Sequence, residues 1–264
     1  MCACAPWREA KVVVRGGMLP LERVQQLHDV TAAAAAESAE PSDDRIREIC
    51  RIMEQITPAD LRLATVAPLE TKQAEGPRII RTQGVYECEA FDIVVFLFPA
   101  GSAIPPHDHP GMTVLSKVLY GSLGMCSYDW LQPPTRDELD EWSREQDRID
   151  SGKDAQHPER IAGPRAARRR GDTVLTPEAP TFVLRPHFCN IHAFEATADC
   201  AVLDVLLPPY DDDRGRDCHY FAEAPSSEEP ADAAMLALIG APPELVIRRA
   251  TYHGPVVTSS TGAP

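Results

Sequence analysis

The sequence contains no long apolar run. Its best candidate, Phe91 to Ile104, is interrupted by Asp92, Pro99 and Gly101, so it falls short of the roughly 20 apolar residues that a membrane-spanning helix needs. The first 30 residues also lack a basic start followed by an apolar core. The sequence therefore predicts neither a transmembrane helix nor a signal peptide, and we expect no membrane partner.

Cysteine and basic residues are also scarce. The 8 cysteines among 264 residues include no Cys-x-x-Cys pair, which argues against a disulfide scaffold or a zinc knuckle and predicts a reducing compartment, cytoplasmic or nuclear. Lysine and arginine total 26 against 40 acidic residues, a net charge of -14. That charge opposes binding to nucleic acid or to an anionic membrane. We expect a basic or neutral partner, with a monomer as the default.

Helices are predicted only near the N-terminus. Apolar residues recur at about every 3.6 positions from Leu19 to Ala36. Ser42 precedes two acidic residues and an apolar face, the pattern of an N-cap. The second helix is expected to end near Thr57, where a Thr-Pro pair predicts a short third helical turn. We assign residues 1–18 to a flexible N-terminus and residues 19–63 to the helices.

From about residue 78 onward, short β-rich runs alternate with Gly, Pro and Asp. Eight or nine such strands, in a chain that is 44% hydrophobic, predict a mainly β fold, a barrel or double-sheet jelly roll. The predicted strands are Ile79-Ile80, Ile93–Phe98, Thr113–Tyr120, Met125–Trp130, Thr173–Leu175, Thr181–Leu184, Ile191–Phe194, Ala201–Leu206 and Leu245–Tyr252.

One stretch interrupts the strands. Residues 132–170 carry many charges and few large apolar side chains, which predicts a flexible surface insert. Its basic end, Arg165 with Arg168 to Arg170, is expected to be a solvated loop rather than a nuclear-import patch. Residues 223–233 and a tail at 258–264 are also expected to be flexible, which leaves a single domain at 19–257 with its barrel at about 78–257.

His107 and His109 are the sharpest chemical feature. Residues two apart in an extended chain point to the same side, so the pair can offer two legs of a metal site. A neutral imidazole is a ligand suited to Fe, Zn, Cu or Ni. Histidines near prolines are also common in turns, so the pair alone leaves both interpretations open.

The context of the pair favours a metal. Gly101, the His107-Asp108-His109 triplet and the later Gly121 resemble the first motif of the cupin barrels. In that motif a glycine, a His-x-His pair and a second glycine frame a metal ion. Asp108 and the nearby Lys117 are interpreted as structural support for the motif.

A third ligand must come from elsewhere in the chain. Many cupins carry a glutamate shortly after the histidine pair, where this chain has Thr113 and Val114. His192, in a later β-rich run, is the natural neutral candidate. A single histidine in an apolar strand is more often a core residue, but the two earlier histidines favour the ligand interpretation.

Seven blocks extend the pattern along the chain: Pro106–Val114, Lys117–Gly121, Ser127–Trp130, Asn190–His192, Leu203–Leu206, Pro208–Tyr210 and Arg216–Tyr220. In this order they resemble the plant cysteine oxidases, relatives of animal cysteamine dioxygenase. The resemblance covers roughly the whole chain except the insert and the tails.

The resemblance implies a cupin-type double-stranded β-helix with two or three helices packed outside. It also implies one Fe(II) held by His107, His109 and His192, with O2 as co-substrate. The implied reaction converts the N-terminal cysteine of a protein into cysteine sulfinic acid, an oxidation that is hard to reverse. Such enzymes act as oxygen sensors that mark hypoxia-response transcription factors for the arginine N-degron pathway.

Four further residues receive roles. Asp204 is flanked by apolar residues, so it must face solvent, a cation or a polar cavity; the resemblance places it near the iron. Tyr210 matches an active-site tyrosine whose hydroxyl binds oxygen species or substrate, and otherwise caps a strand end. Cys218 and Tyr220 match the pair that is crosslinked in cysteamine dioxygenase, and otherwise simply pack together.

Two rival functions stay open. A dioxygenase for cysteamine or free cysteine would use the same metal site, and an arginine near the iron that binds a carboxylate would favour free cysteine. A cupin that binds metal without catalysis is the other rival. The Met1-Cys2 start would expose a cysteine if Met1 were removed, but we attribute this to chance.

Overall fold

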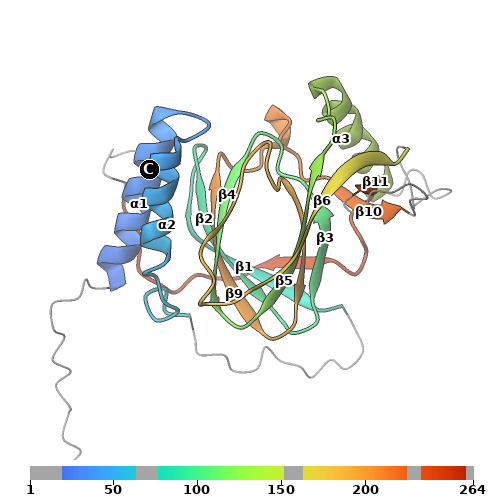
Figure 1. Ribbon diagram of the computed structural model, residues 1–264. Coiled ribbons are helices and arrows are strands. Elements are labelled where there is room, and N and C mark those ends of the chain that lie inside the picture. The colour runs from blue at the N-terminus through green and yellow to red at the C-terminus, as the bar shows by residue number, and fades with distance from the viewer. Residues whose placement is uncertain (1–19, 64–76, 152–162, 225–232, 260–264) are drawn as a thin grey trace, which may run out of the picture.

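A computed structural model describes residues 20–63, 77–151, 163–224 and 233–259 (Figure 1). The predicted flexible N-terminus at 1–18, the Met1-Cys2 pair and the tail beyond residue 259 lie outside these residues. No helix within the described ranges has the length and apolar character needed to cross a membrane.

Two helices open the described chain, α1 (Pro20–Glu37) and α2 (Asp43–Met53). Ser42 caps α2 as predicted, since its hydroxyl accepts a hydrogen bond from the Arg45 N–H. The helix ends four residues before Thr57, and hydrogen-bonded turns follow over 57–63, where the sequence predicts a short third helical turn. The Asp60 carboxylate accepts from the N–H of Thr57 at 2.8 Å and holds this turn.

The remaining elements are mostly strands, so the mainly β class is confirmed. The first sheet has the order β12-β1-β2-β9-β4-β7, and the second, β10-β11-β6-β5-β8-β3, closes on itself through a Tyr220–His107 pair. The elements after α2 are β1 (Ile79–Glu87), β2 (Asp92–Phe98), β3 (Ala103–His107), β4 (Thr113–Tyr120), β5 (Leu123–Trp130), α3 (Arg136–Asp150), β6 (Arg165–Leu175), β7 (Phe182–Leu184), β8 (Ile191–Ala196), β9 (Cys200–Leu207), the short helix η1 (Asp212–Arg214), β10 (Tyr220–Ala224), β11 (Ala233–Ile239) and β12 (Val246–Arg249).

Helices α1 and α2 lie against the outer face of the first sheet, as expected (Figure 1). Leu27 and Ile49 from the helices share one apolar cluster with Ile93, Leu115 and Val205 from the strands, and all five are fully buried. The opposite face of the same sheet looks into the barrel, where the candidate site lies.

The sequence analysis did not predict three of the strands, β3, β10 and β11. β3 contains two consecutive prolines, which lower the strand signal. β10 and β11 are rich in alanine, a residue depleted in strands. The expected flexible piece at 223–233 in fact begins in β10 and ends in β11, and its residues 225–232 lie outside the described ranges.

The prediction of a flexible surface insert at 132–170 was wrong, because much of this stretch forms regular secondary structure. It contains α3 and the first half of β6. Thr135 and Glu138 form a capping box at the start of α3, a Thr-x-x-Glu pattern that was readable from the sequence. Trp142 then packs on Phe221 of β10, with ring centroids 5.7 Å apart, and this contact anchors the helix.

The basic cluster is likewise strand rather than solvated loop. It forms the start of β6 and pairs with β5 and β11. Three of its side chains form ion pairs with carboxylates of α3, β5 and β6 itself, so their charge is partly neutralised. The ion pairs are Arg165–Glu138 (2.8 Å), Arg169–Asp172 (2.6 Å) and Arg170–Asp129 (2.5 Å).

The two glycines of the predicted motif are required by the backbone. Gly101 precedes β3 with φ of 76° and Gly121 follows β4 with φ of 81°, a region that side chains disfavour. A Cβ at Gly121 would lie 2.2 Å from the carbonyl oxygen of Asp199. Both turns therefore depend on glycine, and the first of them leads directly into the strand that carries His107.

Candidate metal centre

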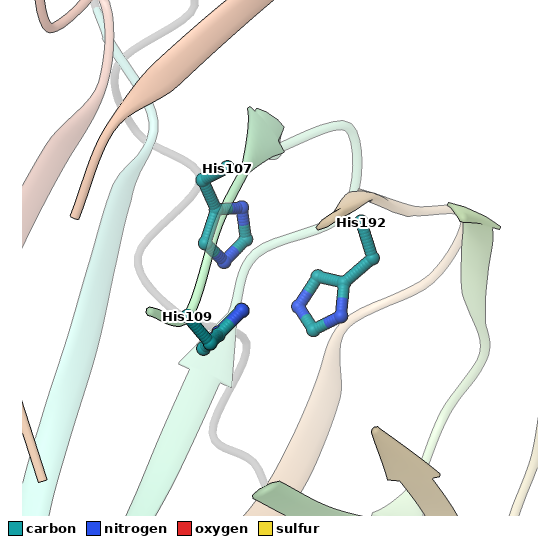
Figure 2. A group of neighbouring side chains, drawn as sticks. All are labelled: His107, His109 and His192. Carbon is teal, nitrogen blue, oxygen red and sulfur yellow. The ribbon is translucent and has the colours of Figure 1, made fainter. Parts of the chain in front are cut away.

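The structure brings His107, His109 and His192 together, as predicted. His107 ends β3 and lies directly opposite His192 of β8 in the antiparallel ladder, where facing side chains come close. His109 follows in the turn after β3. Figure 2 shows the three imidazole rings converging on one point.

The geometry is that of a metal site. One nitrogen from each ring lies within 4.8 Å of the other two, and the ring centroids are 4.7 to 4.9 Å apart. Within the described chain, no carboxylate or thiol joins this cluster. The absence agrees with the Thr113-Val114 departure from the usual cupin pattern.

Backbone carbonyls orient two of the rings. Nδ1–H of His107 donates to the carbonyl oxygen of Pro105 at 2.9 Å, and Nδ1–H of His109 donates to that of Asn190 at 3.0 Å. A carbonyl can only accept, so Nδ1 carries the proton and Nε2 keeps its lone pair free for a metal ion. Nδ1 of His192 has no hydrogen-bond partner among the described residues.

Burial keeps the three imidazoles neutral. It lowers the pKa of His107, lowers that of His109 to about 3 with help from the neighbouring His107, and lowers that of His192 well below its ordinary value. All three are less than a tenth exposed. A set of three neutral nitrogen donors aimed at one point suits a divalent ion such as Fe(II).

The histidines line a cavity of about 280 Å³ between the two sheets. Asp204 of β9 also lines this cavity. Of the surroundings that the sequence left open for its side chain, the structure therefore shows the cavity rather than bulk solvent. Burial raises the pKa of Asp204 to about 7, and the neighbouring Ser116 hydroxyl offsets this only in part. Oδ1 of Asp204 has no partner among the described residues, so it is available to accept a hydrogen bond.

Tyr210, Cys218 and Tyr220 line the same cavity. The Tyr210 hydroxyl donates to the carbonyl oxygen of Asp108 at 2.9 Å, so in this structure it supports the histidine turn. Burial raises the pKa of the Cys218 thiol to about 12. The crosslink between Cys218 and Tyr220 stays a prediction.

Two residues that hold the turn received no role from the sequence. The Asn190 side chain accepts from the N–H of His109 at 3.2 Å and donates to its carbonyl at 2.8 Å. His219, fully buried, contacts both carboxylate oxygens of Asp108 at 3.1 Å. Burial lowers the pKa of His219, but the charge and the hydrogen bond of Asp108, together with the charge of Asp217, outweigh burial and raise the pKa overall.

Lys117 supports the structure as predicted. Its Nζ donates to the carbonyl oxygens of Pro177 and Ala179 at 2.7 and 2.6 Å. These bonds hold the loop between β6 and β7 on β4. The remaining histidines of the described chain, among them His187 and His253, lie outside the cluster.

Known proteins resemble this chain over most of its length. The family model PCO_ADO matches residues 52–257. Plant cysteine oxidase 1 from Arabidopsis thaliana is 33% identical over 70% of this chain and 57% of its own length. Plant cysteine oxidase 2 from the same plant is 31% identical over 81% and 71%.

Animal relatives and solved structures complete the comparison. The 2-aminoethanethiol dioxygenase of Mus musculus is 32% identical over 64% of each chain. Among solved structures, KdgF from Halomonas sp. aligns at 16% identity over 50% of this chain and 80% of its own, with a TM-score of 0.31. The chain spans 57% of the length of the first of these relatives. On its sequence, and with the three histidines of the cupin motif assembled, the chain belongs to the PCO_ADO family.

Proposed function

We propose that this protein is an Fe(II)-dependent thiol dioxygenase that oxidises the N-terminal cysteine of proteins to cysteine sulfinic acid. In the overall reaction R–SH and O2 give R–SO2H, so both oxygen atoms end on sulfur and no other reductant is needed. The observation that carries the proposal is the buried, neutral three-histidine cluster facing a cavity. The names of the relatives, cysteine oxidase and 2-aminoethanethiol dioxygenase, support the same chemistry.

His107, His109 and His192 would hold the iron. Bound Fe(II) would supply the redox chemistry through which O2 reacts with a thiol at neutral pH. The protein contributes a largely apolar chamber, since Phe96, Phe194 and other apolar side chains make up most of the lining. Such a chamber keeps bulk water away from the reacting sulfur.

The lining favours a substrate that has an amine and lacks a nearby carboxylate. Asp204 is the one acidic side chain among the described lining residues, and none of them is Lys or Arg. Asp204 can therefore accept from the amine of an N-terminal cysteine or of cysteamine. The carboxylate of free cysteine would find no cationic partner there, which disfavours that rival.

The size of the chamber favours the end of a chain. At about 280 Å³ it lies at the lower limit of small-molecule pockets, which span about 300–1,000 Å³. It admits a terminal residue but not a folded loop. As part of the same proposal, the substrates are proteins with an exposed N-terminal cysteine, and the enzyme acts as an oxygen sensor for the N-degron pathway in the cytoplasm or nucleus.

Mass spectrometry of a peptide that begins with cysteine tests the proposal. The peptide is incubated in air with Fe(II)-loaded protein, in separate reactions beside cysteamine and free cysteine. We expect a gain of two oxygen atoms on the peptide. His192→Ala should abolish it, because two imidazoles cannot complete the site, whereas the exposed control His253→Ala should leave it unchanged.

Each other outcome has a defined meaning. Oxidation of cysteamine alone would assign the chain to small-thiol metabolism. Bound iron without oxidation of any thiol would support the non-catalytic module and remove the proposed function. Equal activity of His192→Ala and the parent protein would show that the three histidines are not the iron site.

A further inference from the structure

Asp108, the residue between His107 and His109, has each of its polar groups bound by the segment 210–220. Its N–H donates to the carbonyl of His219 at 3.2 Å, and its carbonyl accepts from the Tyr210 hydroxyl. Its carboxylate accepts from the His219 N–H at 2.9 Å and from the ring Nδ1–H at 3.1 Å. The turn between the two ligands is therefore held chiefly by His219.

The other ring nitrogen of His219 reaches helix α3. Its Nε2 lies 3.0 Å from the Ser143 hydroxyl, which is 2.7 Å from a carboxylate oxygen of Asp217. A hydroxyl has one proton to donate, and when that proton goes to Asp217, Nε2 of His219 must be the donor. The imidazole then donates one bond to the Asp108 carboxylate and one to the Ser143 hydroxyl, which in turn donates to Asp217. Trp142 packs against its ring in a T-shaped contact, with ring centroids 5.7 Å apart.

Helix α3 also forms hydrogen bonds with the backbone on both sides of His219. The Gln146 side chain donates to the carbonyl of Cys218 at 2.9 Å and accepts from the N–H of Tyr220 at 3.3 Å. Side chains alternate along an extended segment. Residues 217 and 219 accordingly bind toward α3, whereas Cys218 and Tyr220 line the iron cavity.

We propose that His219 is a positioning residue of the metal centre: through Asp108 it fixes the turn that carries His107 and His109, and through Ser143 it anchors that turn to helix α3. The inference depends on the proposed function only in that the three histidines bind a divalent ion. The hydrogen bond from His219 to Asp108 acts directly on the turn that carries the metal ligands. The hydrogen bond to Ser143 acts on that turn only indirectly, by attaching His219 to helix α3.

Two conservative variants of His219 test its hydrogen bonds to Asp108 and to Ser143 separately. In His219→Asn the side-chain N–H₂ can take the place of Nδ1–H and keep the bond to Asp108. In His219→Gln the longer side chain can replace Nε2–H and keep the bond to Ser143 instead. Both remove the ring, so a role in packing alone would affect both variants in the same way.

The probe is Co(II), whose visible absorption reports the ligand set, titrated into metal-free protein after far-UV circular dichroism confirms folding. We expect the Kd for Co(II) to rise about 10- to 100-fold in His219→Gln, the usual effect of losing a partner next to a metal ligand. The Kd should change less than about threefold in His219→Asn if the Asp108 bond is retained. Exposed His253→Ala serves as the matched control.

Several results would overturn the inference. Equal Co(II) affinity and equal spectra in both His219 variants and the parent would show that His219 does not position the site. Equal losses in both would reduce its role to packing. If neither variant folds, Ser143→Ala and Asp108→Asn replace them, and a normal Co(II) affinity in Asp108→Asn would contradict the proposal. Failure of the parent protein to bind Co(II) or Fe(II) would instead contradict the proposed function.

Discussion

Both faces of β9, a central strand of the first sheet, are buried, but they serve different purposes. Along β9, Leu203 and Val205 belong to the apolar cluster beneath α1 and α2, whereas Val202, Asp204 and Leu206 line the cavity. All eight residues of β9 are buried. The outer face therefore stabilises the fold by apolar packing, whereas the inner face places the ionisable side chain of Asp204 in a cavity.

The comparison teaches that burial alone does not identify a functional residue. Ile93 and Asp204 are both buried, but Asp204 also carries a side-chain oxygen that has no hydrogen-bond partner among the described residues. An unpaired buried carboxylate costs stability. Variants on the two faces should accordingly separate stability from activity.

The largest effect is expected on the outer face. Ile93→Ala removes a fully buried side chain beneath the helices and should lower the free energy of unfolding by about 2–5 kcal/mol. Urea unfolding followed by circular dichroism measures this. The Co(II) affinity of the folded variant should match the parent, and a parallel loss of metal binding would show that the two faces are coupled.

On the inner face, Asp204→Asn should produce the opposite result. Losing a bond between the carboxylate and the substrate amine costs about 1.5–3 kcal/mol, or roughly 10- to 150-fold in kcat/KM. Stability should not fall, because an unpaired buried carboxylate disappears. Peptide oxidation tests the predicted loss of kcat/KM, and urea unfolding of the same preparation tests the predicted stability. Unchanged kcat/KM would show that Asp204 does not contact the substrate.

The smallest effect concerns an acid at the end of the sheet. Burial, aided by the charge of Glu87, raises the pKa of Asp92 from its ordinary value of 3.8 to about 6 in the folded protein. The folded state therefore favours the protonated form, and this stabilisation is complete below pH 3.8 and is lost as the pH rises through 6. At pH 7, Asp92→Asn should be more stable than the parent by about 1 kcal/mol after allowance for screening.

Urea midpoints of both proteins at several values between pH 4 and pH 7 measure this difference. The two stability curves should converge toward pH 4 and separate toward pH 7. Curves that run parallel across the range would show that Asp92 has the same pKa in the folded and unfolded protein.

Much of the site could be predicted because its signals are local. His107 and His109 are two residues apart near a strand end, and the glycines around them mark turns that need positive φ. The missing glutamate at Thr113-Val114 indicated a neutral third ligand, and the structure places the candidate, His192, beside the other two histidines. The insert was misjudged because its charges were taken as disorder, although its Thr-x-x-Glu cap already indicated a helix.

The sequence by itself determined most of the elements and the types of the candidate ligands, since helix caps, strand runs and the His-x-His spacing act over a few residues. Only the tertiary structure decided that Asp204 faces the cavity and that His219 binds Asp108, 111 residues away in the chain. Alternation divides β9 into two sides, but both sides are buried and rich in apolar residues. The strand alone therefore cannot show which side faces the helices, because that depends on how the two sheets and helices α1 and α2 pack together.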